Sequence, residues 1–330
     1  MCWLTPSYKG RFAPSPTGYL HVGNAWVAIL AWLDARRKGG AFILRVEDLD
    51  EARSRDIYRQ AMVDDLRWLG IDWDEGPDVG GPAAPYEQRL RRGRYEQALE
   101  RLREARELYP CFCARSRLLS IASAPQGLFG DEPRYDRRCL RLSDAERAEL
   151  AATKQPSLRL HVPDDALVTV DDRLLGRTTA RPAEGGDFVV RRADGVIAYH
   201  LAVVVDDHAM GVTDVIRGAD LFPSAFRQVY LAERLGYAPP RYAHVPLVVD
   251  EEGRRLAKRH GDLSLRALRE AGVRPQQLVG LLLWLAGQLD RPEPMRPAEA
   301  MDGFDLARLP RHPVVWRAAY TAWLQANADL

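Results

Sequence analysis

The hydrophobic positions near the start of the chain alternate between short extended runs and one long helical run. Residues 25–33 (AWVAILAWL) are all apolar, which predicts a helix that is buried on most sides. We expect this helix to begin near Gly23 and to end at the Gly-Gly pair 39–40, because glycine is favoured just after a helix. Residues 11–13 and 41–46 flank the helix and are predicted to be strands.

A strand, a turn, a helix and a second strand in this order favour a parallel sheet, and ligands of such sheets bind beyond the carboxyl ends of the strands. The second strand leads directly to three carboxylates, Glu47, Asp48 and Asp50. The sequence therefore predicts an α/β fold with polar chemistry at this edge of the sheet.

The alternation continues along the chain with one interruption. Helices are predicted over residues 54–69, 86–107 and 224–235. Strands are predicted over residues 187–191, 197–205 and 243–249, and the chain from residue 263 onward is expected to be mostly helical. Residues 111–182 break the pattern, and we interpret them as an insertion.

Two of the predicted helices have a clear apolar face. In the first it is formed by Ile57, Ala61, Leu66 and Leu69. In the second it is formed by Tyr95, Leu99, Leu102 and Ala105. The opposite face of the second helix is rich in arginine, which fits either a solvated surface or contact with RNA.

Composition narrows the class of protein. The 330 residues are 46% hydrophobic and 28% charged, as in a soluble globular protein of two or three domains. The formal net charge is only +1, so an RNA partner would be held by local patches. The longest apolar run is too short to span a bilayer, and the N-terminus lacks the apolar core of a signal peptide. We therefore expect a cytoplasmic protein with no membrane partner.

Two motifs far apart in the chain indicate a nucleotide site. Residues 11–24 (RFAPSPTGYLHVGN) lead from a strand through a Pro- and Gly-rich turn into a helix, whose first N–H groups suit phosphate oxygens. Residues 255–259 (RLAKR) form a basic segment after a predicted strand. Taken alone, His21 could be an ordinary turn histidine and Lys258 a solvated cation. Together the motifs are typical of a phosphate-cradling turn and a distant lysine.

The motifs PSPTGYLHVGN, RVEDLD, DDHAMGVTDVIRGADL and RLAKR occur in this order, and they resemble those of the class I glutamyl-tRNA synthetase family. The chain is more similar to the short branch of that family, which attaches glutamate to queuosine in tRNA(Asp). The resemblance implies a Rossmann-type parallel-sheet catalytic domain with an inserted zinc-binding subdomain and a C-terminal helical region. It assigns residues 1–110 and 183–262 to the catalytic domain, 111–182 to an acceptor-like insertion, and 263–330 to a helical region similar to a stem-contact region.

The resemblance also implies roles for single residues in ATP binding. The expected ATP contacts are His21, Gly23, Asn24, Arg255 and Lys258. His21 and Lys258 are the expected catalytic residues, His21 at the α-phosphate and Lys258 at the phosphates that leave as pyrophosphate. Magnesium is expected with ATP, although no dedicated ligands are evident. The chain departs from the family pattern at Asn24, where a histidine is usual, and at Arg255 and Ala257, which replace a lysine and a serine of the KMSKS loop.

The amino-acid pocket implied by the resemblance must hold two carboxylates and one ammonium group. Its expected residues are Arg11, Phe12, Ala13, Pro14, Ser15, Glu47, Tyr199 and Arg217. Guanidinium groups bind carboxylates through two parallel hydrogen bonds, which favours glutamate over glutamine. The residues alone leave a second interpretation open, in which Glu47 and Arg217 form an ordinary ion pair. We interpret Asp206, Asp207 and His208 as structural, because adjacent strand residues point to opposite faces.

Three of the four cysteines lie close together in the sequence, as C-x-C followed by Y-x-x-x-C. Cys111, Cys113 and Cys139 with Tyr135 could complete a tetrahedral structural zinc site, and this pattern resembles the short branch of the family. Three buried hydrophobic cysteines are the alternative. Cys2 is expected to be a free thiol.

The expected reaction is ATP-dependent formation of glutamyl-adenylate, followed by transfer of glutamate to queuosine at the wobble position of tRNA(Asp). Only about seventy residues follow the RLAKR segment, too few for the helical anticodon-binding domains of a full glutamyl-tRNA synthetase. The alternatives are a truncated synthetase that charges the 3′ end of tRNA(Glu), an enzyme that passes activated glutamate to another acceptor, and a catalytically inactive RNA-binding paralogue. The expected partners are L-glutamate, ATP and tRNA(Asp), and the expected state is a monomer.

Overall fold

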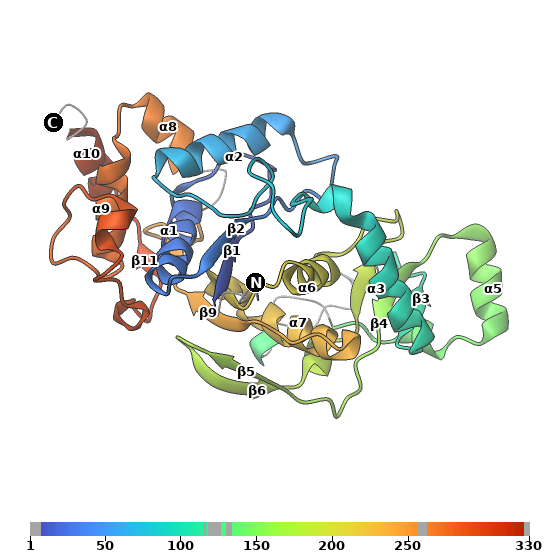
Figure 1. Cartoon of the computed structure of the whole chain (residues 1–330). Coiled ribbons are helices and arrows are strands. Elements are labelled where there is room, and N and C mark those ends of the chain that lie inside the picture. The colour runs from blue at the N-terminus through green and yellow to red at the C-terminus, as the bar shows by residue number, and fades with distance from the viewer. Residues whose placement is uncertain (1–7, 115–116, 118–126, 130–133, 257–262, 327–330) are drawn as a thin grey trace, which may run out of the picture.

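The computed structural model describes residues 8–114, 117, 127–129, 134–256 and 263–326 (Figure 1). The strands are β1 (Lys9–Phe12), β2 (Ala41–Leu44), β3 (Leu108–Cys111), β4 (Ser157–Leu160), β5 (Val168–Asp172), β6 (Gly176–Ala180), β7 (Phe188–Arg191), β8 (Asp214–Gly218), β9 (Arg241–Val245), β10 (Val248–Val249) and β11 (Val314–Val315). The helices are α1 (Val22–Arg37), α2 (Asp56–Trp68), α3 (Arg92–Glu104), α5 (Asp144–Thr153), α6 (Tyr199–Ala209), α7 (Phe222–Leu235), α8 (Leu265–Glu270), α9 (Pro275–Leu285) and α10 (Ala318–Ala326).

The predicted parallel sheet is present and positions the site. β1 pairs in parallel with β2, and β9 pairs in parallel with β8 and with β5. The two groups of strands lie side by side, because the Thr213 amide donates to the Lys9 carbonyl at the edge of β1 (2.9 Å). A hairpin between β5 and β6 completes the sheet on its far side.

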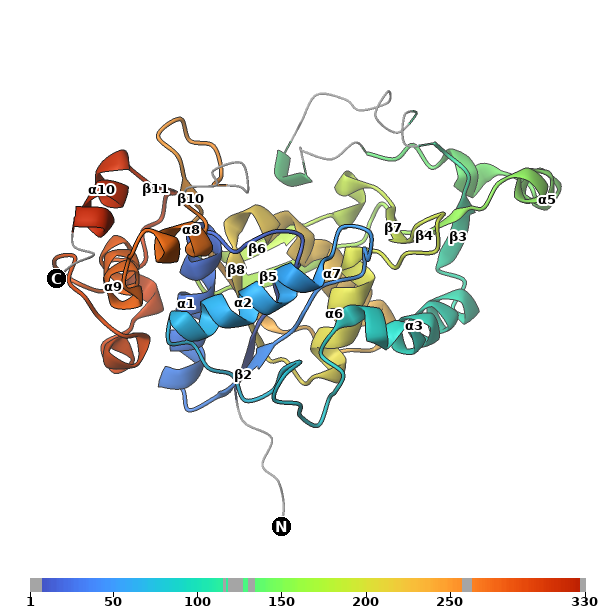
Figure 2. The same ribbon diagram turned by 90° about the horizontal axis from the view of Figure 1, so that it is seen from above.

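Helix α1 forms where the sequence predicts it. Its apolar run is buried among β1, β2 and β8, and Gly39 just beyond the helix adopts φ +61°, a conformation that favours glycine. The same core continues into α9 and the C-terminal segments. A second core joins α3, α6 and α7 to β5, β7 and β9. Figure 2 shows the C-terminal helices α9 and α10 at one end of the molecule and α5 at the other.

The predicted strand over residues 197–205 is wrong, because this segment begins helix α6. Seven consecutive residues of α6, 201–207, are buried. An apolar run that contains three valines resembles a buried strand, and periodicity alone does not distinguish it from a helix packed on several sides.

Residues 187–191 do form a strand, β7, but it does not continue the parallel sheet. It pairs antiparallel with β4, which pairs antiparallel with β3. The parallel sheet takes β5 from before β7 and β8 and β9 from after it, and the hydrophobic pattern did not reveal β8 because both Asp214 and Arg217 interrupt its five buried residues. The boundaries proposed for the insertion remain a prediction.

Smaller differences concern the ends of elements. The helix predicted over residues 86–107 is shorter, with a 3₁₀ turn at Gln88–Arg91 before α3, so Ala105 is exposed beyond the helix end. Ile57 in α2 is 57% exposed although it belongs to the predicted apolar face. The strand predicted over 243–249 is divided into β9 and β10, and β10 pairs with β11 near the C-terminus. No helix in the described ranges has the length and apolar character needed to cross a bilayer.

Candidate functional site: a charged pocket at the edge of the parallel sheet

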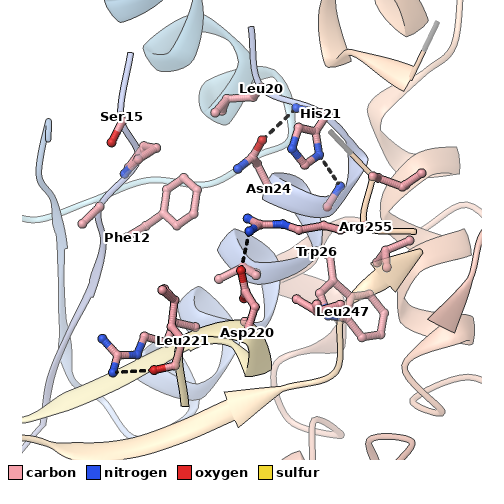
Figure 3. Close-up of a pocket in the computed structure, with 18 of the residues that line it drawn as sticks. Phe12, Ser15, Leu20, His21, Asn24, Trp26, Asp220, Leu221, Leu247 and Arg255 are labelled. Carbon is pink, nitrogen blue, oxygen red and sulfur yellow. Dashed lines mark hydrogen bonds and ion pairs between the residues drawn. The ribbon is translucent and has the colours of Figure 1, made fainter. Parts of the chain in front are cut away.

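A pocket of about 360 Å³ lies beyond the carboxyl ends of β1, β2 and β8. Every residue predicted for ATP or glutamate binding that the structure describes lines it: Arg11, Phe12, Ala13, Pro14, Ser15, His21, Gly23, Asn24, Glu47, Tyr199, Arg217 and Arg255. Lys258 and Ala257 lie outside the described residues, so their predicted positions stay predictions. The early turn and the start of the late basic segment, about 230 residues apart in sequence, therefore border one cavity (Figure 3).

The turn that precedes α1 is held by a reciprocal cap. The Gly23 amide donates to Nδ1 of His21 (3.0 Å), and the His21 amide donates to Oδ1 of Asn24 (3.0 Å) (Figure 3). Because Nδ1 accepts, a neutral His21 ring carries its hydrogen on Nε2. The Asn24 oxygen is used by the cap, which leaves the amide NH₂ as the donor that this residue can offer to a ligand.

Gly23 is required by the histidine itself. A Cβ at this position would lie 2.9 Å from Cε1 of His21, too close for any real side chain. The glycine therefore allows the imidazole to fold over the first turn of the helix. The sequence assigns Gly23 to the expected ATP contacts, and the structure adds this separate reason for a glycine.

The floor of the pocket, which includes Arg11, Glu47 and Arg217, rests on a buried network of charges. Arg45, whose side chain is fully buried, pairs with Asp207 (2.5 Å) and with Glu47 (3.1 Å). Arg11 approaches the same Asp207 oxygen at 3.4 Å. Burial alone would raise the pKa of Asp207, but Arg45 and Arg11 lower it below its usual value. For Glu47, burial raises the pKa in spite of the same two arginines.

Arg217, at the end of β8, is a buried cation with neutral partners. Its Nε donates to Nε2 of His244 (2.9 Å), one terminal nitrogen donates to Oε1 of Gln228 (2.7 Å), and the other donates to the Leu221 carbonyl (3.3 Å). None of the described carboxylates forms an ion pair with it, so the alternative of a Glu47–Arg217 pair is not what the structure contains. A buried charge without a counter-ion favours binding of an anion.

Arg255 and Asp220 also line the pocket, and they are joined by an ion pair (Figure 3). Asp220 belongs to the motif DVIRGADL, but nothing in the sequence distinguished it as a partner of Arg255. Tyr199 is the first residue of α6 and also lines the pocket. Its position depends on the helix that replaced the predicted strand.

Asp206, Asp207 and His208 are on helix α6, so the argument from alternating strand faces was wrong. Their side chains nevertheless point in different directions. Asp206 accepts from Arg91 (2.6 Å), and its other oxygen accepts from Gln88 and Tyr95 (2.8 Å each). Asp207 faces the pocket arginines, and His208 stacks on Tyr237 (3.7 Å between ring centroids). In the described residues these groups therefore act in packing and charge pairing.

A second cluster lies beside the antiparallel sheet. The sulfur atoms of Cys111, Cys113 and Cys139 lie within 4.8 Å of one another, with 3.6 Å between Sγ of Cys113 and Sγ of Cys139. The Tyr135 hydroxyl oxygen is 3.4 Å from Sγ of Cys111 and 3.6 Å from Sγ of Cys113. Zn–S bonds of about 2.3 Å in a tetrahedron place sulfurs about 3.8 Å apart. The donor set therefore fits a zinc ion with little rearrangement.

Comparison with known proteins identifies the family of the chain. A family model described as "tRNA synthetases class I (E and Q), catalytic domain" matches residues 8–309. The protein named Glutamyl-Q tRNA(Asp) synthetase from Symbiobacterium thermophilum is 54% identical over 92% of this chain and 94% of its own length. The one of that name from Nitratidesulfovibrio vulgaris is 47% identical over 93% of this chain and 95% of its own length.

Solved structures give the same result. The glutamate-tRNA synthetase from Elizabethkingia anophelis superposes with a TM-score of 0.83 at 28% identity, covering 96% of this chain and 69% of that protein. The fold is that of a class I aminoacyl-tRNA synthetase catalytic domain, and such enzymes are ligases. The chain belongs to the family of tRNA synthetases class I (E and Q).

Proposed function

We propose that this ligase activates L-glutamate with ATP and transfers the glutamyl group to queuosine in tRNA(Asp). The observation that carries the first half is the charge of the pocket floor. Arg11, Glu47 and Arg217 line the pocket, and Arg45 and Asp207 form a buried ion pair behind them, so these five side chains together carry one excess positive charge. Glutamate has two carboxylates and one ammonium group, which give one negative charge, so it complements the floor.

In the first step, a carboxylate oxygen of glutamate attacks the α-phosphorus of ATP. A C–O–P bond forms, the bond from the α-phosphorus to the bridging oxygen breaks, and pyrophosphate leaves with the electron pair. Holding the two reactants in one cavity supplies much of the rate enhancement. Magnesium bound with ATP would neutralise phosphate charge.

The chain's own groups would orient the reactants. Arg217 would bind a substrate carboxylate through the two N–H donors that its protein partners leave over, and Glu47 would accept from the ammonium group. His21 would donate to the α-phosphate. Lys258 would place a positive charge at the phosphates that leave, a role that rests on its place in the sequence.

In the second step, a hydroxyl of the queuosine cyclopentene ring attacks the activated carbonyl carbon. The new ester bond forms, AMP leaves with the phosphate oxygen, and the hydroxyl proton goes to solvent or to the departing phosphate. The choice of acceptor is supported by the relatives named Glutamyl-Q tRNA(Asp) synthetase, at 54% and 47% identity. The Glutamate–tRNA ligase 2 of Acidithiobacillus ferrooxidans is less similar, at 43% identity. A monomeric enzyme that works in the cytoplasm, where tRNA and ATP meet, is part of this proposal.

Cys111, Cys113, Cys139 and Tyr135 would hold one structural zinc ion. The proposal is supported by the convergence of the three sulfurs and one phenol oxygen, and by the fixed loop between the last two ligands. Arg137 in this loop has φ +58° and pairs with Asp187 just before β7 (3.2 Å). All four positions would be filled by protein, so the ion would stabilise the fold and would take no part in the reaction.

A transfer assay tests this function. The protein is incubated with ATP, labelled glutamate and one of three RNAs: tRNA(Asp) with queuosine, tRNA(Asp) without it, and tRNA(Glu). We expect label only on the queuosine-bearing tRNA(Asp), and we expect it to survive removal of the 3′ end. Label at the 3′ end of tRNA(Glu) would instead support a synthetase that charges that tRNA, and no label on any RNA would contradict both.

A further inference from the structure

The partners of Arg217 differ from those of the other two arginines at the pocket floor. Arg11 and Arg45 pair with carboxylates, whereas Arg217 is held by an imidazole, an amide and a backbone carbonyl. Its guanidinium also lies over the ring of Tyr242, at 4.8 Å from the centroid. The neutral acceptors fix the plane of the guanidinium, and they do not cancel its charge.

The imidazole is itself held by a carboxylate on the neighbouring strand. Nδ1 of His244, on β9, lies 2.6 Å from Oδ2 of Asp172, the last residue of β5. Both side chains are completely buried. With the Asp172 carboxylate as acceptor, Nδ1 carries the hydrogen, and Nε2 is left as an acceptor that faces Nε of Arg217.

We propose that Asp172 and His244 are positioning residues for substrate binding, which hold Arg217 as an unpaired, correctly oriented cation at the pocket floor. Asp172 selects the His244 tautomer that accepts from Arg217. This role rests on the proposed binding of glutamate. Neither residue lines the pocket, but both set the affinity for a substrate carboxylate through Arg217.

The neutral imidazole of His244 leaves the charge of Arg217 available, which a carboxylate in its place would not do. A carboxylate in contact with Arg217 would satisfy its charge and compete with a substrate carboxylate for the same donors. Burial lowers the pKa of His244 to about 4, although the hydrogen bond that Nδ1 donates to Asp172 favours the charged ring. The imidazole is therefore neutral near pH 7 and leaves the charge of Arg217 for the ligand.

Asp172 also has a local structural role, which the variants must separate from positioning. Its Oδ1 accepts from the amides of Leu174 and Leu175 (2.9 Å each) and so holds the β5–β6 turn. Both oxygens of Asp172 also lie within hydrogen-bond distance of the His244 amide (3.3 Å for Oδ1 and 3.1 Å for Oδ2). Asp172→Asn keeps Oδ1 as the acceptor for the turn and for this amide, and it replaces Oδ2 with NH₂, which donates to Nδ1 of His244. The ring must then carry its hydrogen on Nε2, where it opposes the Nε–H of Arg217.

The test is glutamate-dependent ATP–pyrophosphate exchange by Asp172→Asn, His244→Phe and His244→Gln. The amide of glutamine can donate to Asp172 and accept from Arg217, so it is the conservative replacement. We expect the first two variants to raise the KM for glutamate by roughly ten- to a hundredfold, as for loss of an oriented hydrogen bond to a charged group, with the KM for ATP within about twofold. His244→Gln should recover most of the affinity. His208→Phe, at an exposed histidine of α6, is the matched control and should leave both constants unchanged.

The tautomer itself is measured by ¹⁵N NMR of the histidine side chains. We expect the Nδ1–H form of His244 in the wild type and the Nε2–H form in Asp172→Asn. A wild type that shows no glutamate-dependent exchange would contradict the proposed function. An active wild type with an unchanged KM for glutamate in both Asp172→Asn and His244→Phe, or with His244 in the Nε2–H form, would overturn the positioning role alone.

Discussion

At the scale of single residues, the pocket combines structural and chemical uses of the same side chain. His21 closes the first turn of α1 through Nδ1, and this contact fixes which ring nitrogen carries the hydrogen. Gly23 is needed for the ring to lie there. A residue that caps a helix is held in one orientation by the helix itself, so the His21 donor that we propose for the α-phosphate would be oriented before ATP binds.

The proposed role of Lys258 is tested by Lys258→Ala. Loss of a positive charge at the leaving phosphates should lower glutamate-dependent ATP–pyrophosphate exchange by roughly a hundredfold or more. Arg254→Ala removes a neighbouring exposed cation that pairs with Asp250 (2.8 Å) and should keep near-normal exchange. Normal exchange in Lys258→Ala would remove this residue from its assigned role.

The site could be predicted from the sequence where the motif contains the residue. Arg11, Glu47 and Arg217 are examples, and the fold gathers them from β1, β2 and β8. Asp172 and His244 were not predicted, because they act through a contact between strands that are distant in sequence. Arg45 begins the motif RVEDLD and directly follows the apolar strand β2, and a buried charge needs a partner, but the sequence did not reveal which carboxylates pair with it.

At the scale of elements, the contact between α9 and the segment after it depends on a glycine. A Cβ at Gly280 would lie 1.7 Å from the Glu293 carbonyl oxygen, a backbone atom that cannot turn away. We expect Gly280→Ala to lower the free energy of unfolding by about 1–3 kcal/mol, as overpacking does in other cores. Chemical unfolding measures this change.

Gly93 in α3 is the matched control. A Cβ there meets no atom within 4 Å, so Gly93→Ala should raise the free energy of unfolding by roughly 0.5–1 kcal/mol through helix propensity. A stable Gly280→Ala protein would show that α9 and the Glu293 segment are farther apart than described.

The contact between α2 and α8 should depend on pH. Burial raises the pKa of Asp65 to about 6, although Arg269 on α8 opposes this (3.1 Å). The folded state then binds more protons than the unfolded state between about pH 4 and pH 6, so this group's contribution to stability falls as pH rises through that window.

Asp65→Asn remains neutral and should reduce the loss of stability between pH 4 and pH 7 by roughly 1 kcal/mol relative to the wild type. Chemical unfolding at the two pH values gives the comparison. An equal change in the free energy of unfolding between pH 4 and pH 7 in the wild type and Asp65→Asn would contradict the raised pKa of Asp65.

The elements themselves were predictable to different degrees. Helix α1 has a clear start signal, an apolar interior and a glycine end, so local chemistry was enough. Helix α6 was predicted as a strand because its buried run has no polar face to show a helical period. The pairing of β3, β4 and β7 joins residues up to 52 apart in sequence, and no local pattern encodes such pairing.

At the scale of the whole molecule, the pocket at the edge of the parallel sheet and the cysteine cluster belong to separate parts of the fold. The cluster packs with Tyr109 beside the antiparallel sheet and forms a core of only a few residues. A core of this size supplies little hydrophobic stabilisation, which is why a metal ion would matter there.

We therefore expect about one zinc ion per chain in elemental analysis of the purified protein. Chelation, or Cys113→Ser, should lower the melting temperature and abolish or reduce the zinc content. A protein that contains no zinc, and whose melting temperature is unchanged by chelator, would instead favour the three buried cysteines acting as hydrophobic residues.

The most direct test of the claim that the pocket binds glutamate compares two amino acids of the same size, one with a side-chain carboxylate and one with a neutral amide. ATP–pyrophosphate exchange is measured for the wild type and for Arg217→Lys. Each protein is assayed once with L-glutamate and once with L-glutamine. The account predicts strong exchange with glutamate, little with glutamine, and a KM for glutamate about tenfold or more higher in Arg217→Lys, because lysine keeps the charge and loses the planar fork. Equal exchange with both amino acids, or a KM that is unchanged in Arg217→Lys, would contradict it.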